Sequence, residues 1–339
     1  MVISKTPVRL SFFGGGTDYP DYFKRKKCAV LGTTIDKYIY VTINHGSPFF
    51  DHRIRVSYSK SETVNEISEI EHPSVRAILQ FLKMDELLDI HIVADLPART
   101  GLGSSSAFTV CFLNACYAHK GIFAGKERLA AEAIHIEQDL LGESVGIQDQ
   151  IHAAYGGLNT IRADSHGMTV FPAIMSPENR ALLESSLLLF YTRMTRSANE
   201  IVQEQIANTR KLELDGQLEV MASQVDEAQE VLARTSGPTL LRRFGEMLNV
   251  GWQLKKQLST QITNSAIDHY YSEAVKHGAL GGKIGGAGGG GFLMLVVDKQ
   301  HQPAVRAALK ELEEVPIKFE NNGASIIYST EPPTYLQHR

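Results

Sequence analysis

A glycine- and serine-rich loop that leads directly into an apolar helix is the segment of this chain best suited to chemistry. The sequence PARTGLGSSSA occupies Pro97–Ala107, and the apolar stretch FTVCFLNACYA follows it. Glycines let backbone amides turn toward an anion, and serine hydroxyls and helix N-terminal N–H groups add donors. The loop predicts binding of a nucleoside triphosphate; the alternative is a turn that caps a buried helix. It matches neither a Walker loop nor a dinucleotide fingerprint.

Two carboxylates further along could serve a metal ion and a proton transfer. Glu137 and Asp149 are twelve positions apart with a glycine-containing turn between them, so they cannot share one helix face. If the turn reverses the chain, both converge on one cleft, one for a divalent metal and one for a substrate proton. Two solvated carboxylates are the alternative. His135 and Asp139 are interpreted as a surface pair, because no third metal ligand is in view.

Two more glycine segments flank these residues in the chain. KIGGAGGGGF, over Lys283–Phe292, lies between a predicted helix and the strand GFLMLVVD. Glycine this dense predicts close approach of the backbone to a ligand, and a disordered linker is the alternative. Near the start, PVRLSFFGGGTDYPDYF places Asp18 after a glycine triplet, where it could accept hydrogen bonds from substrate hydroxyls or only stabilise a turn. Arg9, inside the apolar strand, needs a carboxylate or a phosphate as partner.

The composition indicates an ordinary globular chain long enough for two domains. Its 339 residues are 43% hydrophobic and carry a net charge of -4, which argues against nucleic-acid binding. Three cysteines, Cys28, Cys111 and Cys116, show no paired spacing and predict a reduced, cytoplasmic protein. The chain shows no apolar leader with a cleavage site and no apolar run of about 18 residues, so neither export nor a membrane span is expected.

Alternating apolar and polar residues predict half-buried strands at Tyr38–Asn44, Ile54–Ser59 and Asp89–Pro97. The third strand delivers the chain into the glycine- and serine-rich loop. Helices are predicted after that loop, over about Ser105–Ala118 and over Lys126–Leu141.

The second half begins with an apolar run at Ser186–Thr192, which predicts a central strand. Three helices are predicted across Ala198–His277. A β-α-β-β pattern then closes the chain, with GFLMLVVD, a helix over Pro303–Glu313, VPIKF and ASIIYS. This order predicts an α+β protein of two lobes, residues 1–170 and 171–339.

The three glycine segments, in this order and spacing, resemble the motifs of the galactokinase, homoserine kinase, mevalonate kinase and phosphomevalonate kinase (GHMP) superfamily over nearly the whole chain. The resemblance implies an N-terminal lobe similar to the second domain of ribosomal protein S5, a ferredoxin-like C-terminal lobe, and a cleft that binds ATP, Mg²⁺ and a small-molecule substrate.

The resemblance also implies roles for individual residues. Asp149 matches the candidate catalytic base, Arg9 would balance charge near it, and Ser105 and Glu137 match the metal site. The residues expected to bind the nucleotide are Arg99, Gly101, Leu102, Gly103, Ser104, Ser105, Ser106, Gly286 and Gly288. The residues expected to bind the substrate are Gly15, Thr17, Asp18, Tyr19, Arg193, Arg196 and Gly289.

Within the superfamily, the GGGTDYP form with GIQDQ and YTRMTRSANEIV is most similar to D-glycero-D-manno-heptose 7-phosphate kinases. That similarity implies phosphorylation of the C1 hydroxyl of a sugar phosphate, in the synthesis of nucleotide-activated heptose. Arg193 and Arg196 are the favoured anchors for the phosphate already on the sugar, with Arg99 and the Lys24–Lys27 run as other candidates. A kinase of an unphosphorylated sugar such as fucose and a non-catalytic sensor are the alternatives, and a homodimer is left open.

Overall fold

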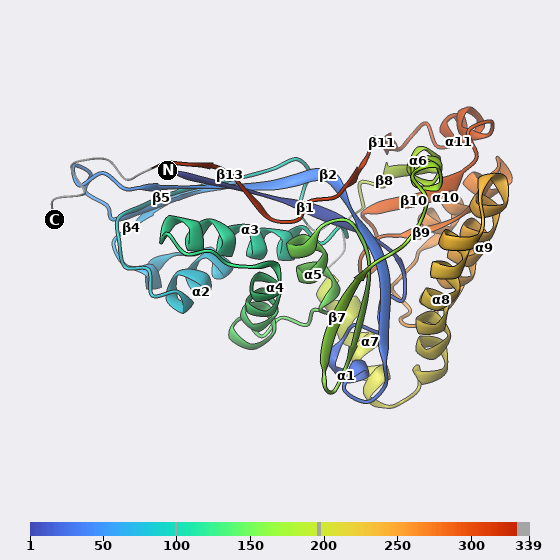
Figure 1. Ribbon diagram of the computed structural model, residues 1–339, viewed down its shortest axis with the longest axis horizontal. Helices are drawn as coiled ribbons and strands as arrows, with labels where there is room; N and C mark the ends of the chain where they lie inside the picture. The colour runs from blue at the N-terminus through green and yellow to red at the C-terminus, as the bar shows by residue number, and fades with distance from the viewer. Residues whose placement is uncertain (99, 195–197, 331–339) are drawn as a thin grey trace.

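The protein forms two lobes, each with its own β-sheet (Figure 1). The structure, a computed structural model, describes residues 1–98, 100–194 and 198–330. The nine-stranded sheet of the N-terminal lobe runs β13-β1-β2-β5-β3-β4, with β6 and β12 also paired to β2, and β7 paired to β6. Its strands are β1 (Val2–Phe13), β2 (Cys28–His45), β3 (Ile54–Ser57), β4 (Ser61–Val64), β5 (Leu88–Ala94), β6 (Leu158–Asp164), β7 (Gly167–Pro172), β12 (Phe319–Glu320) and β13 (Ser325–Ser329).

The long strand β2 organises this sheet because it changes partners along its length. It pairs with β6 over its first residues and with β5 over Ile39–His45, while β1 stays on its other side. The register against β1 jumps between Pro7 and Val8, so that Asp36 and Lys37 of β2 have no partner residue in β1. Such a bulge bends a strand, and here it lies where the partner changes.

Helices cover one face of this sheet (Figure 1). They are α2 (Pro73–Phe81), α3 (Ser104–His119), α4 (Lys126–His135), which continues into the π-helix η2 (Ile136–Leu140), and α5 (Gln148–Tyr155). Every residue of α3 from Ser106 to Tyr117 is buried, as its apolar sequence predicts. The helices expected at 105–118 and 126–141 are thereby confirmed.

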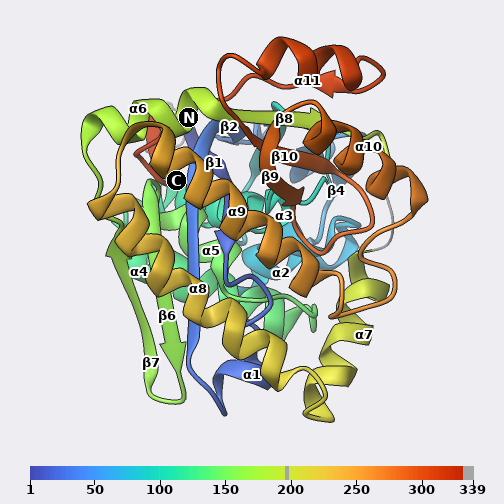
Figure 2. The same cartoon turned by 90° about the vertical axis from the view of Figure 1, so that its right-hand side faces the viewer.

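The C-terminal lobe contains a four-stranded sheet in the order β11-β8-β10-β9. Its central strands β8 (Leu187–Tyr191) and β10 (Phe292–Val297) are almost wholly apolar and buried, while β9 (Ala279–Ile284) and the short β11 (Glu313–Glu314) form the edges. The long helices α8 (Asp215–Arg234) and α9 (Gly237–Lys255) lie side by side in front of the sheets (Figure 2).

Three expectations about the second half were wrong. Four helices, and not three, fill the predicted helical region, because Asn264 caps a separate helix α10 (Ser265–Lys276) through its side-chain oxygen. The first of the four helices is α7 (Ala198–Arg210), and α8 and α9 follow it. The last two strands, β12 and β13, pair with β2 and β1 of the first sheet instead of completing the second, and the helix expected to end at Glu313 is the shorter α11 (Gln302–Ala308).

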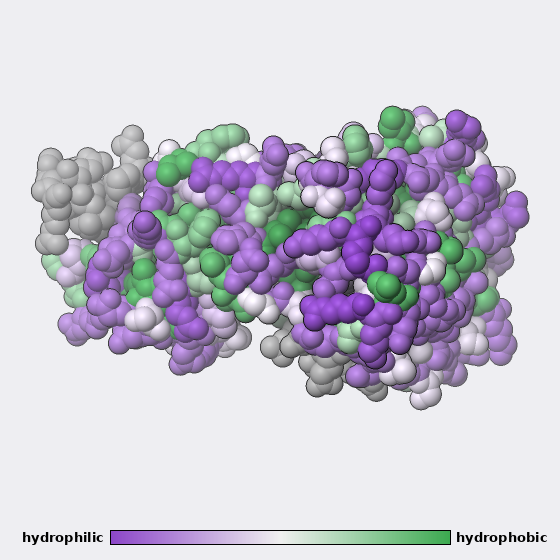
Figure 3. All heavy atoms as spheres, turned by 90° about the horizontal axis from the view of Figure 1, so that it is seen from below, coloured by the Kyte–Doolittle hydropathy of each residue, from purple (hydrophilic) through white to green (hydrophobic). Residues whose placement is uncertain are grey.

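The remaining elements are short and connect the larger ones. They are α1 (Pro20–Phe23), the 3₁₀ turn η1 (Ile67–Glu69) and α6 (Pro177–Ser186). Figure 3 shows a largely hydrophilic face with hydrophobic side chains scattered over it. Among the residues that the structure describes, no helix is both long and apolar enough to span a membrane.

Candidate active site

A bidentate ion pair between Arg9 and Asp149 lies in the main cleft of the molecule. Arg9 Nε donates to Asp149 Oδ1 at 2.8 Å and Nη2 to Oδ2 at 2.9 Å, and Nη1 donates to the Gly101 carbonyl at 2.6 Å. The Arg9 side chain is 5% exposed and that of Asp149 26%, so the carboxylate opens to the cleft while the guanidinium is held behind it. The turn after η2 does reverse the chain, since α5 brings Asp149 back against β1.

The glycine- and serine-rich loop and the C-terminal glycine segment meet beside this ion pair. A Cβ added to Gly101 would lie 2.6 Å from the Gly285 carbonyl oxygen, so only glycine allows this approach. Gly103 is the N-cap of α3 at φ 73°, and a Cβ there would lie 3.1 Å from Asp149 Oδ2. The first amides of α3 have no acceptor inside the helix, and Ser104 and Ser105 line the cleft. The arrangement is suited to bind phosphate.

Asp18 lies at the other wall of the cleft and is 1% exposed. Its Oδ1 accepts a hydrogen bond from the Gly16 amide at 3.0 Å, and its Oδ2 accepts one from the Gln148 amide at 3.4 Å. A Cβ on Gly146 would lie 2.0 Å from Oδ2, so this glycine makes room for the carboxylate. Burial, and to a smaller extent the Asp149 charge, raises the pKa of Asp18. Tyr19 and Gly15 line the same cleft. Burial also raises the pKa of Tyr19.

Glu137 is positioned by the π-helix η2 and is 1% exposed. Its Oε2 accepts hydrogen bonds from Ser106 Oγ at 2.8 Å and Gln150 Nε2 at 2.5 Å, while Oε1 has no partner among the described residues. Burial raises the pKa of Glu137 to about 7. A buried oxygen without a donor, next to a serine hydroxyl, fits the oxygen ligands that magnesium prefers. The serine that Glu137 contacts is Ser106, whereas Ser105 is exposed.

Two buried lysines in the cleft were missed by sequence reasoning. Lys255 is 7% exposed and Lys283 is 5% exposed, and both line the cleft. Burial lowers the pKa of Lys283 to about 7 and that of Lys255 well below its usual range. The signal that pointed to Arg9, a charged residue within an apolar pattern, was present for both lysines. Lys283 lies in an apolar strand. Lys255 lies on the face of α9 that carries the buried Phe244, Leu248 and Trp252.

Several expected site residues lie behind the cleft. Thr17 Oγ1 donates to the Gly14 carbonyl at 2.7 Å and is buried, the Leu102 carbonyl accepts from the Arg9 amide, and the Gly289 amide donates to the Ile262 carbonyl. These residues hold their loops in place, and in the segment of Gly289 it is Gly286 and Gly288 that line the cleft. The Arg193 side chain is 70% exposed and lies 3.4 Å from Glu313, so it is not brought to the cleft. Arg99 and Arg196 lie outside the described residues.

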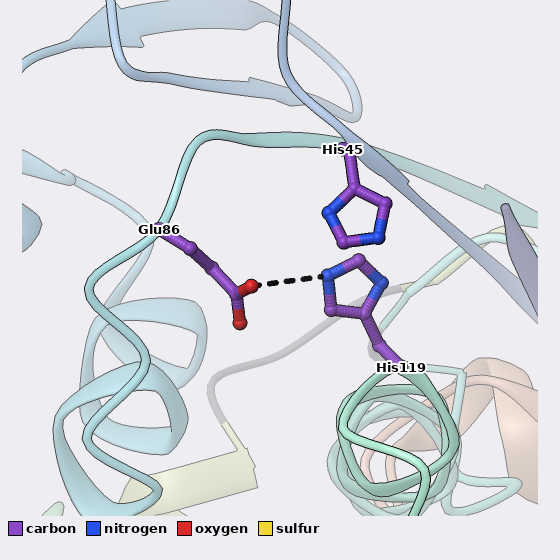
Figure 4. A group of neighbouring side chains, drawn as sticks. All are labelled: His45, Glu86 and His119. Carbon is purple, nitrogen blue, oxygen red and sulfur yellow. Dashed lines mark ion pairs between the residues drawn. The ribbon is translucent and has the colours of Figure 1, made fainter. Parts of the chain in front are cut away.

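Another group of possible metal ligands lies far from the cleft, at the ends of β2 and α3. His45, Glu86 and His119 have ligand atoms within 4.8 Å of one another. Figure 4 shows Glu86 directed at His119, whose Nε2 is 3.6 Å from Glu86 Oε2, and the two imidazole rings lie 4.2 Å apart. None of the three lines the cleft. His135 and Asp139 form the expected surface pair at 2.7 Å.

Comparisons with known proteins agree with this geometry. Residues 73–157 match the GHMP kinases N terminal domain and residues 238–314 match the GHMP kinases C terminal domain. The chain is 29% identical to D-glycero-alpha-D-manno-heptose 7-phosphate kinase of Campylobacter jejuni, covering 91% of this chain and 93% of that protein. It is 25% identical to L-fucokinase/L-fucose-1-P guanylyltransferase of Bacteroides fragilis, over 90% of this chain and 35% of that one.

The structural comparison extends over the whole fold. A crystal structure of a D-glycero-D-manno-heptose 1-phosphate kinase from Bacteroides thetaiotaomicron superposes with a TM-score of 0.79 at 25% identity, covering 98% of this chain and 100% of that one. With both family domains in order and this two-lobed fold, the chain belongs to the GHMP kinases. It is an ATP-dependent phosphotransferase.

Proposed function

We propose that this protein transfers the γ-phosphoryl group of ATP to the C1 hydroxyl of D-glycero-D-manno-heptose 7-phosphate. The observation that carries the proposal is the Arg9–Asp149 ion pair, which faces the cleft between the phosphate-binding loop and Asp18. The similarity to the Campylobacter jejuni heptose 7-phosphate kinase over nearly the whole chain supports the choice of sugar.

In this proposal, Asp149 accepts the proton of the attacking hydroxyl. Each of its oxygens receives one hydrogen bond from Arg9 and keeps lone pairs for the substrate. Arg9 fixes the orientation of the carboxylate and places positive charge near the transferred group. Asp18 accepts a hydrogen bond from a ring hydroxyl, and the amides at the start of α3 bind the nucleotide phosphates.

The metal would be held by Glu137 together with the hydroxyls of Ser105 and Ser106. Bound magnesium neutralises negative charge on the phosphates. The free Glu137 Oε1 supplies the carboxylate ligand, and Gln150 and Ser106 keep the side chain in place through Oε2. The raised pKa of Glu137 implies that protons compete with the metal near pH 7, so that metal binding strengthens as the pH rises.

The test is ADP release with magnesium-ATP across a sugar panel. The panel contains D-glycero-D-manno-heptose 7-phosphate, the 1-phosphate, the unphosphorylated heptose, mannose and fucose. Turnover confined to the 7-phosphate supports the proposal. The 1-phosphate is included because the name of the Bacteroides thetaiotaomicron protein gives that position. Binding without any turnover would indicate a sensor and contradict the proposed reaction.

The second candidate is a kinase of an unphosphorylated sugar such as fucose. The similarity to the Bacteroides fragilis L-fucokinase, which covers 90% of this chain, favours it. Turnover of fucose in preference to both heptose phosphates would select this candidate.

A further inference from the structure

Lys255 and Lys283 have amino groups that form no ion pair with a carboxylate in the described part of the chain. Lys283 Nζ donates to the Phe12 carbonyl at 3.0 Å, and Lys255 Nζ donates to the Ile284 carbonyl at 3.2 Å and to the Gly286 carbonyl. An ammonium group has three N–H donors, so one remains on Lys255 and two remain on Lys283. Both side chains are buried and both line the cleft.

Keeping both buried lysines charged without a counter-ion is costly for the folded protein. Removing a charge from water is unfavourable even after relaxation, and hydrogen bonds to backbone carbonyls offset only part of that penalty. Neighbouring positive charges add to this penalty: after burial, Lys283 and then Arg9 lower the pKa of Lys255, and Arg9 lowers the pKa of Lys283. An anion that enters the cleft would compensate these charges.

The position of the lysines indicates which anion this is. Nucleotide phosphates have their own donors at the N-terminus of α3, in the N-terminal lobe. The lysines belong to α9 and β9 of the C-terminal lobe. The carboxylate whose negative charge raises the pKa of both lysines is Asp18, the residue expected to bind the sugar. Among the described residues that line the cleft, Arg9 is the one further lysine or arginine, and it already forms an ion pair with Asp149.

We propose that Lys255 and Lys283 form an anion subsite that binds the phosphate group already present on the sugar substrate. The inference rests on the proposed function and sharpens it, since it assigns the selectivity for a phosphorylated sugar to two residues. It also replaces Arg193, which the structure leaves exposed beside Glu313, as the anchor.

The test compares kcat/KM for heptose 7-phosphate and for unphosphorylated heptose in the wild type, Lys255→Met and Lys283→Met. A lost hydrogen-bonded charge lowers kcat/KM for the phosphorylated sugar about 10- to 100-fold per lysine, mainly through KM. The value for the neutral sugar changes about threefold or less. Lys256→Met is the matched control, because Lys256 Nζ lies 3.5 Å from Asp268 away from the cleft. The control is expected to match the wild type.

Two outcomes separate the subsite from the proposed function. Equal losses for both sugars in the lysine variants, with a wild type that still prefers the phosphorylated sugar, overturn the subsite alone. A wild type that prefers the neutral sugar overturns the proposed function. If the variants do not fold, inhibition of the wild type by inorganic phosphate decides. The subsite predicts competition with the sugar phosphate, and competition with ATP alone would contradict it.

Discussion

The cleft and the far end of the N-terminal lobe both bring ionisable side chains out of water, but they balance charge differently. At the far end, the half-exposed Glu86 carboxylate lies at ion-pair distance, 3.6 Å, from the Nε2 of the buried His119 ring, an atom with no hydrogen bond among the described residues, and His45 packs on that ring. In the cleft, Arg9 and Asp149 balance each other, while Lys255 and Lys283 bind only carbonyls and Glu137 keeps one oxygen without a donor. The α3 helix separates the two regions by 16 residues, or about 24 Å.

The difference shows which region has a ligand to bind. In the far cluster a carboxylate and an imidazole lie at ion-pair distance, so a positive charge on His119 would have its counter-charge within the cluster. In the cleft, two buried lysines and one carboxylate oxygen lack partners of opposite charge among the described residues, and bound anions and a bound cation would supply them. On this comparison the cleft is the region whose lysines have no counter-charge within the described part of the chain, and we expect the ligands to bind there.

Asp149→Asn is expected to give the largest effect. It removes the proposed base and one partner of Arg9, so we expect kcat to fall about 100-fold or more while the fold is retained. Steady-state kinetics with a circular dichroism spectrum check this, and Asp139→Asn on the surface is the matched control. An undiminished turnover rate would show that Asp149 is not the base.

Gly146→Ala is expected to damage sugar binding. The new methyl group would lie 2.0 Å from Asp18 Oδ2 and push the carboxylate from its place. We expect KM for the sugar to rise about tenfold, and the free energy of unfolding to fall by about 1–3 kcal/mol. Gly216→Ala in α8, where an added Cβ meets nothing within 4 Å, should leave KM unchanged and should not lower the free energy of unfolding. An unchanged KM in Gly146→Ala would separate Asp18 from sugar binding.

Glu137→Gln should alter the pH dependence of stability in the metal-free protein. The folded-state pKa of about 7 is raised, so the protonated carboxyl favours the fold at low pH and this contribution is lost as the pH rises through 7. The glutamine variant does not ionise, so its stability relative to wild type should increase by about 2–3 kcal/mol between pH 5 and pH 8. Chemical denaturation in EDTA at both pH values measures this, and a constant difference would contradict it.

Glu86→Gln should give the smallest effect. His119 lowers the pKa of Glu86, so the carboxylate contributes stability at neutral pH that is lost as the pH falls through the lowered pKa. Because Glu86 is 41% exposed, the loss at pH 7 should be under about 1 kcal/mol, with kcat/KM unchanged. A large loss of activity would mean that the far cluster is not merely structural.

The sequence predicted the parts of this account that depend on local pattern. Glycine density and the apolar run placed the loop and α3, and Arg9 in an apolar strand predicted a buried ion partner. The sequence did not decide whether the partner of Arg9 is a carboxylate or a phosphate. Asp149 lies 140 positions away, and only the fold brings the two residues together. The return of β12 and β13 to the first sheet is a long-range pairing of the same kind, which local periodicity does not encode.

The lysines show a different limit. Lys255 lies on the buried face of an amphipathic helix, but a lysine there is usually a long stem with its charge in water. Only the packing of α9 against β9 and the Gly286 loop shows that the ammonium group remains buried. In contrast, Arg193 follows a buried strand and looked well placed, yet its side chain turns outward to Glu313.

The most direct test of the central claim is NMR of the product formed from ATP and D-glycero-D-manno-heptose 7-phosphate. The account predicts a new phosphorus resonance coupled to the anomeric proton, with the original 7-phosphate retained. A new phosphate at any other carbon, or none despite ADP release, would contradict the assignment of the cleft as an anomeric sugar-phosphate kinase site.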